Sequence, residues 1–255
     1  MTNQNAAASP SDWSDFKIIA HRGASAVAPE NTLAAIARAA DLGARSVELD
    51  VMLSSDDVPV IIHDTDLART TNGTGPVAAH SFDALARLDA GSWFSGAFAG
   101  EGIPSLAAAV ALILSRNLAL NLEIKPSPGE DRATASGAIA LLAEAWSDPA
   151  TLVLSSASIE ALAVARDVAP QWRRGLIADI PPPDWRDLFA DLGCASLHCE
   201  ASTATPSLIE EVHAAGYRLL AYTVNRPAVA ATLFKNGVDG IFTDDPAAMI
   251  AAFGA

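Results

Sequence analysis

The feature that most restricts the fold of this chain is a regular alternation of short apolar runs with alanine-rich stretches. Short apolar runs bounded by turn residues indicate strands, and the longer stretches indicate helices. The predicted strands cover residues 16–20, 46–53, 58–63, 119–124, 152–155, 175–177, 195–198, 218–223 and 240–243. The predicted helices cover residues 32–42, 105–116, 131–146, 158–168, 184–191, 206–215 and 227–236.

Eight of these strands are expected to form one parallel series. Strands 46–53 and 58–63 are joined by only four residues, whereas a parallel pair needs a crossover of about a dozen or more. These two strands must therefore form an antiparallel hairpin, and strand 58–63 lies outside the series. Eight parallel strands alternating with helices predict an α/β fold, the (β/α)8 TIM barrel, and a doubly wound open sheet is the rival arrangement.

The chain length agrees with a single domain. It has 255 residues, and an α/β barrel occupies about 250 as one unit. We expect residues 1–15 to form an N-terminal tail and residues 16–255 to form the barrel. Residues 64–104 interrupt the alternation and are rich in glycine, threonine and aromatic residues, which predicts a small insertion after the second barrel unit. Asn31 is the expected N-cap of helix 32–42.

Composition and charge limit the class of protein and its partners. A hydrophobic content of 51% and a mean hydropathy of +0.26 exclude a disordered chain. The formal net charge is -14 and no basic block exists, which argues against a nucleic acid held by charge. No apolar run is long enough for a membrane span, and no signal peptide is visible, so we expect a cytoplasmic protein. Cys194 and Cys199 are expected to be buried apolar residues. The sequence predicts no oligomeric state.

Three carboxylates are predicted to face the inside of the barrel. Glu48 and Asp50 are two residues apart, so both lie on one face of their strand, and apolar neighbours take the other face. Glu123 has the same setting on the next barrel strand. Like charges this close repel unless a proton or cation lies between them, and Mg²⁺ and Ca²⁺ prefer oxygen ligands. The trio therefore predicts a site for one divalent cation; a buried ion-pair network with Arg22 and Lys125 is the alternative.

Two histidines and two basic residues are predicted at the same strand ends. His21 and His63 carry the side chain whose pKa best suits proton transfer near neutral pH. Arg22 and Lys125 supply positive charge suited to phosphate oxygens. Together with a metal that neutralises phosphate charge, this set suits phosphodiester hydrolysis. It also explains how an acidic protein could hold an anionic substrate.

An ordered series of motifs resembles the glycerophosphodiester phosphodiesterase family. The motifs are HRG at 21–23, PENT at 29–32, ELDV at 48–51, HD at 63–64, RTTNGTG at 69–75, LDAGSWF at 88–94, IPSL at 103–106, LEIK at 122–125, TVN at 223–225 and GVDGIFTD at 237–244. They cover nearly the whole chain from residue 18. One such motif would be weak evidence, but the ordered set, with the insertion in its family place, is specific.

The resemblance implies the barrel fold and metal-dependent hydrolysis of glycerophosphodiesters to an alcohol and sn-glycerol 3-phosphate. The site residues that it implies are His21 and His63 as the general acid/base pair, Glu48, Asp50 and Glu123 as ligands of one divalent cation, Mg²⁺ or Ca²⁺, and Arg22 and Lys125 as phosphate contacts. It also implies that the insertion caps the pocket and touches the glycerol end. Trp93, Phe94 and Tyr222, which stands where the family usually has Trp, are the remaining candidate substrate contacts.

Three other functions stay open from the sequence. The first is a phospholipase-like lyase that stops at a cyclic phosphate. The second is a non-catalytic barrel that binds phosphodiesters, although a binder need not keep both histidines. The third is a structural barrel with a buried charge cluster. The preferred alcohol group, the choice between the two metals and the division of acid and base roles between the histidines are also open.

Overall fold

The apolar runs form the strands of one nine-stranded sheet in the computed structural model, which describes residues 13–254. The strands are β1 (Ile18–His21), β2 (Ser46–Leu53), β3 (Pro59–Ile61), β4 (Ala119–Ile124), β5 (Leu152–Ser156), β6 (Arg173–Ile177), β7 (Ser196–Glu200), β8 (Arg218–Tyr222) and β9 (Gly240–Thr243). Parallel pairing links the strands in the order β1, β9, β8, β7, β6, β5, β4 and β2, and β1 also pairs with β2. The sheet therefore closes into a TIM barrel, which excludes the open sheet.

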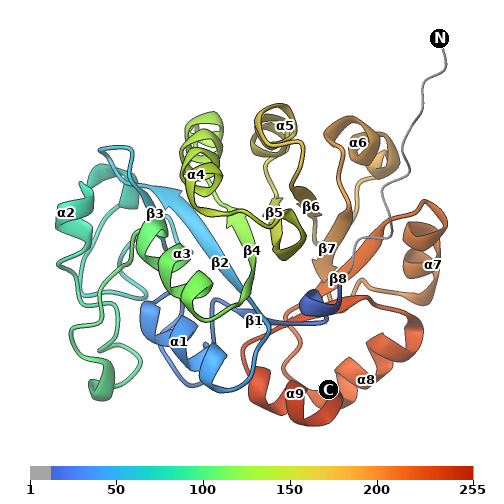
Figure 1. Ribbon diagram of the computed structural model, residues 1–255, viewed down its shortest axis with the longest axis horizontal. Helices are drawn as coiled ribbons and strands as arrows, with labels where there is room; N and C mark the ends of the chain where they lie inside the picture. The colour runs from blue at the N-terminus through green and yellow to red at the C-terminus, as the bar shows by residue number, and fades with distance from the viewer. Residues whose placement is uncertain (1–12, 255) are drawn as a thin grey trace.

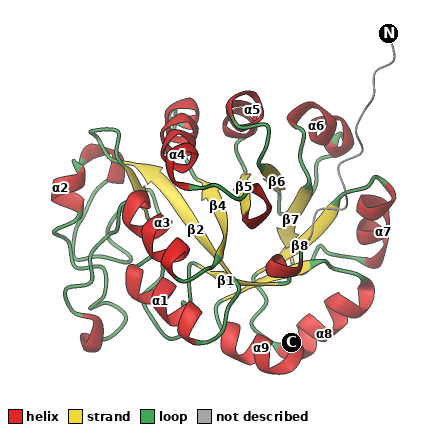
Figure 2. Cartoon of the chain, viewed as in Figure 1, coloured by secondary structure: helices red, strands yellow, loops and turns green. Residues whose placement is uncertain are grey.

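The helices other than α2, which belongs to the insertion, surround this barrel (Figure 1), and loops join them to the strands (Figure 2). They are α1 (Leu33–Asp41), α2 (Phe82–Leu85), α3 (Leu106–Ser115), α4 (Asp131–Ala145), α5 (Ile159–Val168), α6 (Trp185–Leu192), α7 (Pro206–Ala214), α8 (Pro227–Asn236) and α9 (Pro246–Phe253). The sequence-based prediction missed α9, an alanine-rich helix whose N-cap Asp245 accepts a hydrogen bond from the Ala248 amide. The predicted hairpin is confirmed, because β3 pairs antiparallel with β2.

The start of the chain differs from the prediction. The predicted strand 16–20 begins only at Ile18, because Ser14–Phe16 forms a short 3-10 helix, η1, that buries Phe16. Residues 1–12 of the predicted tail lie outside the described residues. In residues 13–15, the part of the predicted tail that the structure describes, the main-chain oxygen of Asp15 accepts a hydrogen bond from the Ser46 hydroxyl.

The predicted N-cap of α1 is wrong. Thr32, not Asn31, has the extended backbone of an N-cap, and its hydroxyl accepts a hydrogen bond from the Ala35 amide. Asn31 is instead buried in a left-handed conformation with φ 58°. Its side chain is thereby directed to a carboxylate of the barrel rather than to the helix end.

Alternation along the strands divides the barrel into an outer and an inner face. Val47, Leu49 and Val51 of β2 belong to a buried cluster shared with the surrounding helices. A separate cluster forms the apolar floor of the barrel, with Phe16, Ile19, Ala119, Val153, Leu220 and Phe242. The inner face above this floor carries polar and charged side chains. This distribution directs the chemistry of the chain to one end of the barrel.

The insertion at 64–104 has little regular structure and lies beside the β2–β3 hairpin (Figure 1). Besides α2 it contains two 3-10 helices, η2 (Val77–Ala79) and η3 (Gly96–Phe98), and a further one, η4 (Pro149–Thr151), precedes β5. A small apolar cluster including Met52, Val60 and Leu85 joins the insertion to the hairpin. Among the described helices, none is both long and apolar enough to cross a membrane.

Candidate active site

The three predicted carboxylates meet at the carboxyl ends of β2 and β4. Asp50 stands opposite Glu123 in the strand register, and Glu48 stands opposite His21 of β1. Ligand oxygens of Glu48, Asp50 and Glu123 all lie within 4.8 Å of one another. Oxygen ligands of Mg²⁺ or Ca²⁺ lie about 2.0–2.6 Å from the ion. One cation could therefore contact all three carboxylates.

A tight turn after β1 brings the main chain to this trio. Arg22 has φ 56° and its amide donates a hydrogen bond to Glu48 Oε2 at 3.0 Å. Gly23 follows with φ 82°, and a Cβ on it would lie 2.6 Å from the carbonyl carbon of Ala35. Only glycine allows α1 to pack this closely on the turn. The HRG motif therefore encodes a backbone shape as well as two candidate site residues.

The trio carries more negative charge than its neighbours neutralise. Arg22 Nε lies 3.4 Å from Asp50 Oδ2, and Lys125 Nζ lies 3.9 Å from Asp50 Oδ1. Nevertheless burial, followed by repulsion from Asp50, raises the pKa of Glu48 well above its usual value and that of Glu123 to about 7. Both basic residues pair with Asp50, and among residues 13–254 neither Glu48 nor Glu123 has an arginine or lysine within ion-pair distance. A further cation would fit the donor set.

This electrostatic imbalance predicts an unusual pH dependence for the metal-free protein. The pKa of Glu123 is about 7 in the folded chain against an ordinary value of 4.5, so the folded state binds more protons between these pH values. The free energy of unfolding should therefore fall as pH rises from about 4.5 to about 7. Calorimetry in a chelator should show this fall, and Mg²⁺ or Ca²⁺ should reverse it; a melting temperature that rises over the same interval would contradict the prediction.

Each predicted histidine has an aspartate on its Nδ1 atom. His21 Nδ1 lies 2.7 Å from Asp244 Oδ1, and His63 Nδ1 lies 2.6 Å from Asp64 Oδ1. A carboxylate at Nδ1 holds the proton on that nitrogen and directs Nε2 outward from the pair. His21 Nε2 is 4.0 Å from Glu48 Oε2, and His63 Nε2 contacts Lys125 Nζ. Both Nε2 atoms therefore face the charged centre of the site.

The two histidine–aspartate pairs have different surroundings. Asp244 also accepts hydrogen bonds from Ser25 and Asn225, and although burial raises its pKa, these partners and His21 bring it down to about 2. The Arg69 guanidinium, followed by His63, lowers the pKa of Asp64. Both aspartates are therefore ionised over the whole range in which histidine titrates.

Arg69 of the insertion connects the His63 pair to the turn after β1. It donates to Asp64 and also, through both terminal nitrogens, to the carboxylate of Glu30 at 2.8 and 2.7 Å. Glu30 accepts a further hydrogen bond from Arg22 at 2.7 Å. The insertion is thus attached to the site by paired ionic hydrogen bonds, which have defined geometry.

The candidate substrate contacts are not all brought together. Tyr222 lines a small cavity with His21, Glu48 and Glu123, and its hydroxyl donates to Asp179 at 2.6 Å. Trp93 and Phe94 lie in the insertion with their rings in edge contact at 5.7 Å. Neither of them lines that cavity or the cleft of about 420 Å³ beside His21 and Arg22. Their predicted contact with substrate stays a prediction.

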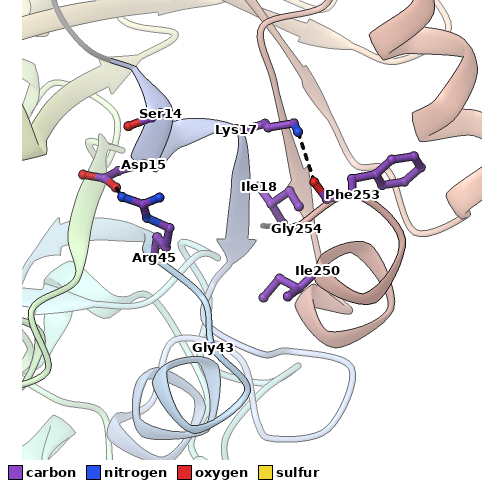
Figure 3. Close-up of a pocket in the computed structure, with 9 residues that line it drawn as sticks. All are labelled: Ser14, Asp15, Lys17, Ile18, Gly43, Arg45, Ile250, Phe253 and Gly254. Atoms are coloured by element: carbon purple, nitrogen blue, oxygen red, sulfur yellow. Dashed lines mark hydrogen bonds and ion pairs between the residues drawn. The ribbon is translucent and has the colours of Figure 1, made fainter.

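Another pocket, of about 230 Å³, lies at the opposite end of the barrel (Figure 3). Figure 3 labels its lining residues Ser14, Asp15, Lys17, Ile18, Gly43, Arg45, Ile250, Phe253 and Gly254. Its two cationic groups are engaged, since Arg45 pairs with Asp15 at 2.7 Å and Lys17 donates to the Phe253 carbonyl at 3.0 Å. Barrel enzymes place their chemistry at the carboxyl ends of the strands, so this pocket is not the candidate active site.

Sequence reasoning missed the residues that hold the predicted ones. Asp244 and Asp64 orient the histidines, Asn31 donates to Asp50 Oδ2 at 2.7 Å, and Arg69 and Glu30 link the insertion to the turn. All five lie inside the family-like motifs, which was the available signal. Asp244 lies 223 positions from His21 and Arg69 lies 39 positions from Glu30, so no local pattern could identify these two pairs, whereas Asp64 directly follows His63.

A closed barrel with acidic, basic and imidazole side chains at the carboxyl ends of its strands defines an enzyme of the TIM-barrel class. The model of the glycerophosphoryl diester phosphodiesterase family matches residues 21–248. The chain belongs to this family, and it is a phosphodiester-hydrolysing enzyme.

Relatives match along nearly the whole chain. A glycerophosphodiester phosphodiesterase of Caldanaerobacter subterraneus subsp. tengcongensis is 36% identical over 237 residues, covering 91% of this chain and 96% of the relative. The structure of an Oleispira antarctica phosphodiesterase, in complex with the product sn-glycerol-3-phosphate, has 37% identity and a TM-score of 0.92, covering 95% and 99% of the two chains. A glycerophosphodiester phosphodiesterase of Agrobacterium tumefaciens str. C58 has 32% identity and a TM-score of 0.77, covering 92% and 99%.

Proposed function

We propose that this enzyme cleaves glycerophosphodiesters to an alcohol and sn-glycerol 3-phosphate with the help of one divalent cation. The observation that carries the proposal is the placement of two histidine–aspartate pairs beside a trio of carboxylates, two of them buried. The product bound in the Oleispira antarctica relative supports sn-glycerol 3-phosphate as a product here.

Glu48, Asp50 and Glu123 are the proposed ligands of the cation. Their donors are hard oxygens, and Glu48 Oε1 is buried with no hydrogen-bond partner among residues 13–254. When bound, Mg²⁺ or Ca²⁺ neutralises phosphate charge and the charge that develops on the oxygens during displacement. Arg22 and Lys125, both close to Asp50, are proposed to bind the remaining phosphate oxygens.

His63 is proposed as the general base. Its pKa is lowered chiefly by burial; Arg22 and Lys125 lower it further, whereas Asp50 and Asp64 act in the opposite direction. The imidazole is therefore neutral near pH 7, and Nε2 can accept a proton from the nucleophile once Lys125 turns from it to a phosphate oxygen. The nucleophile is water or a hydroxyl of the substrate's own glycerol.

His21 is proposed as the general acid. Its Nε2 atom faces the site, and the ionised Asp244 on Nδ1 holds the ring in the orientation from which Nε2 can donate a proton. In-line attack on phosphorus breaks the bond to the alcohol oxygen, and that oxygen receives the proton of His21. When water is the nucleophile, His63 then releases its proton to solvent and His21 takes one up from solvent. When the glycerol hydroxyl is the nucleophile, water opens the cyclic phosphate, His21 accepts the proton of that water and His63 returns its proton to the glycerol oxygen.

A product analysis tests this function. The enzyme is incubated with glycerophosphocholine, -ethanolamine, -glycerol and -inositol in Mg²⁺, in Ca²⁺ and in EDTA, and the products are followed by phosphorus NMR. We expect sn-glycerol 3-phosphate with metal and none in EDTA. Accumulation of a cyclic phosphate would favour the lyase, and an unchanged substrate under all conditions would favour a binding barrel. Either result would overturn the proposal.

Asparagine in place of Asp244 or Asp64 should lower kcat on the order of 10²-fold, because the amide can donate to Nδ1, favour the wrong tautomer and misplace the ring. The measurement is steady-state turnover of the best substrate of the panel. Asp239→Asn is the matched control, since Asp239 also pairs with a histidine, His213, at 2.8 Å but outside the site. Equal losses of kcat in all three variants would show that the effect is structural.

A further inference from the structure

A layer of buried polar side chains lies in the barrel between the apolar floor and the carboxylate trio. Asn121 of β4, Ser155 of β5, and Ser196 and His198 of β7 are each at most 1% exposed. Asn121 precedes Glu123 by two residues on the same inward face of β4. Interior layers of a TIM barrel are ordinarily filled by bulky branched residues, so polar residues here need another explanation.

Gly175 makes room for His198 in this layer. It stands on β6 opposite Ser155 on one side and Ser196 on the other. A Cβ on Gly175 would lie 2.5 Å from His198 Nε2 and 2.9 Å from Ser196 Oγ. The imidazole therefore occupies the space of the missing side chain, and its ring packs near Phe242 at 5.2 Å.

Two atoms of this layer lack hydrogen-bond partners. Asn121 donates to Ser155 Oγ at 2.8 Å, and His198 Nε2 lies 2.9 Å from Ser196 Oγ. Within residues 13–254, however, Asn121 Oδ1 and His198 Nδ1 have no partner. Buried polar atoms are almost always satisfied by protein or by ordered water.

Both residues line one cavity of about 30 Å³, together with His21, Glu48, Glu123 and Tyr222. A water molecule needs about 10–15 Å³ of such space, whereas drug-sized ligands need pockets of about 300 Å³ or more. Burial lowers the pKa of His198 to about 3, so the ring is neutral and offers one donor and one acceptor. Because Nε2 already contacts Ser196, a water molecule can pair with Nδ1 in either tautomer as well as with the amide oxygen of Asn121.

We propose that this cavity is a binding site for ordered water held by His198 and Asn121, and that His198 acts through this water as a positioning residue for Glu48 and Glu123. The water connects the polar layer to Glu48 and Glu123, whose carboxylates are otherwise repelled by the neighbouring Asp50. Outer partners of this kind orient metal ligands in other proteins. The second half of this proposal rests on the proposed function, because it assumes that the carboxylates hold a cation.

Crystal structures of the full chain, metal-free and with Ca²⁺, test the water site. We expect a water within hydrogen-bond distance of His198 Nδ1 and Asn121 Oδ1 in both. An empty or apolar cavity overturns the proposal. This arm is independent of the proposed function, since it requires no metal and no turnover.

Titration calorimetry with Mg²⁺ and Ca²⁺ tests the positioning role. His198→Phe removes both nitrogens and should weaken metal binding by about 10–100-fold, whereas His198→Gln keeps a polar atom and should retain most of the affinity. Gly175→Ala displaces the imidazole without removing it and should weaken binding as well. Leu220→Val, in the apolar floor, is the control and should bind metal like the wild type.

The outcomes separate the two proposals. Equal losses in His198→Phe and His198→Gln, or no loss in either, overturn the positioning role. If His198→Phe does not fold, Asn121→Ala takes its place in the comparison with His198→Gln, because it also removes a proposed partner of the water and should weaken metal binding. A wild-type protein that binds neither cation refutes the proposed function and the positioning role together, while the crystal structures still decide the water site.

Discussion

Replacing His63 or His21 with alanine should lower kcat for glycerophosphodiester cleavage by about 10²–10⁴-fold. Each imidazole faces the carboxylate trio through Nε2 and is held at Nδ1 by its own aspartate. Removing the ring removes the proposed proton acceptor or donor, but it removes little buried apolar surface. Steady-state kinetics should therefore show the loss while thermal melting stays close to that of the wild type.

A third histidine provides the control for this experiment. His213 of α7 is partly exposed and pairs with Asp239 outside the site. His213→Ala should keep its kcat, and because its imidazole is exposed its melting should also stay close to that of the wild type. Turnover near the wild-type level in both His21→Ala and His63→Ala would refute the acid/base assignment.

Glu123→Gln should abolish most activity and at the same time stabilise the metal-free protein. The variant loses one proposed ligand, so kcat/KM should fall by roughly 10³-fold, the equivalent of several kcal/mol of transition-state stabilisation. It also removes a buried carboxyl whose pKa is raised to about 7 by burial and by Asp50. Above that pH the ionised Glu123 carboxylate destabilises the metal-free wild type, whereas the uncharged glutamine of the variant does not.

Calorimetry at pH 8 in a chelator measures the second effect, and metal titration measures the first. Glu160→Gln is the matched control, because Glu160 lies exposed on α5 and its partner Arg132 is 3.7 Å away at the surface. A Glu123→Gln protein that binds metal normally and melts earlier than the wild type would instead support a structural ion-pair network around the trio.

Much of the fold could be predicted because its signals are local. The spacing of two between Glu48 and Asp50 placed both carboxylates on one strand face, and the short connection after β2 required a hairpin. Element boundaries were less certain, as at η1, where burial of Phe16 shortens the predicted strand. Asn31 shows the same weakness, because a residue type common at N-caps serves a buried carboxylate instead.

The partners within the site could not be predicted. His21 and Asp244 are separated by 223 positions in sequence and meet only because β1 pairs with β9 when the barrel closes. Arg69 reaches Glu30 because the insertion folds back along the β2–β3 hairpin. Nothing in the sequence around Gly175 indicates that its missing side chain makes room for the His198 imidazole.

The sequence by itself determined the number and direction of the strands, the inward position of the carboxylates and the residue types available for chemistry. Hydrophobic periodicity and short connections act over a few residues, so they can be followed along the chain. Only the tertiary structure decided that Asp244 holds His21, that Arg22 and Lys125 both pair with Asp50, and that a polar layer lies beneath the trio. These properties depend on distances across the closed barrel and on burial. Both set the free energy of a charged group, and neither can be read from its position in the sequence.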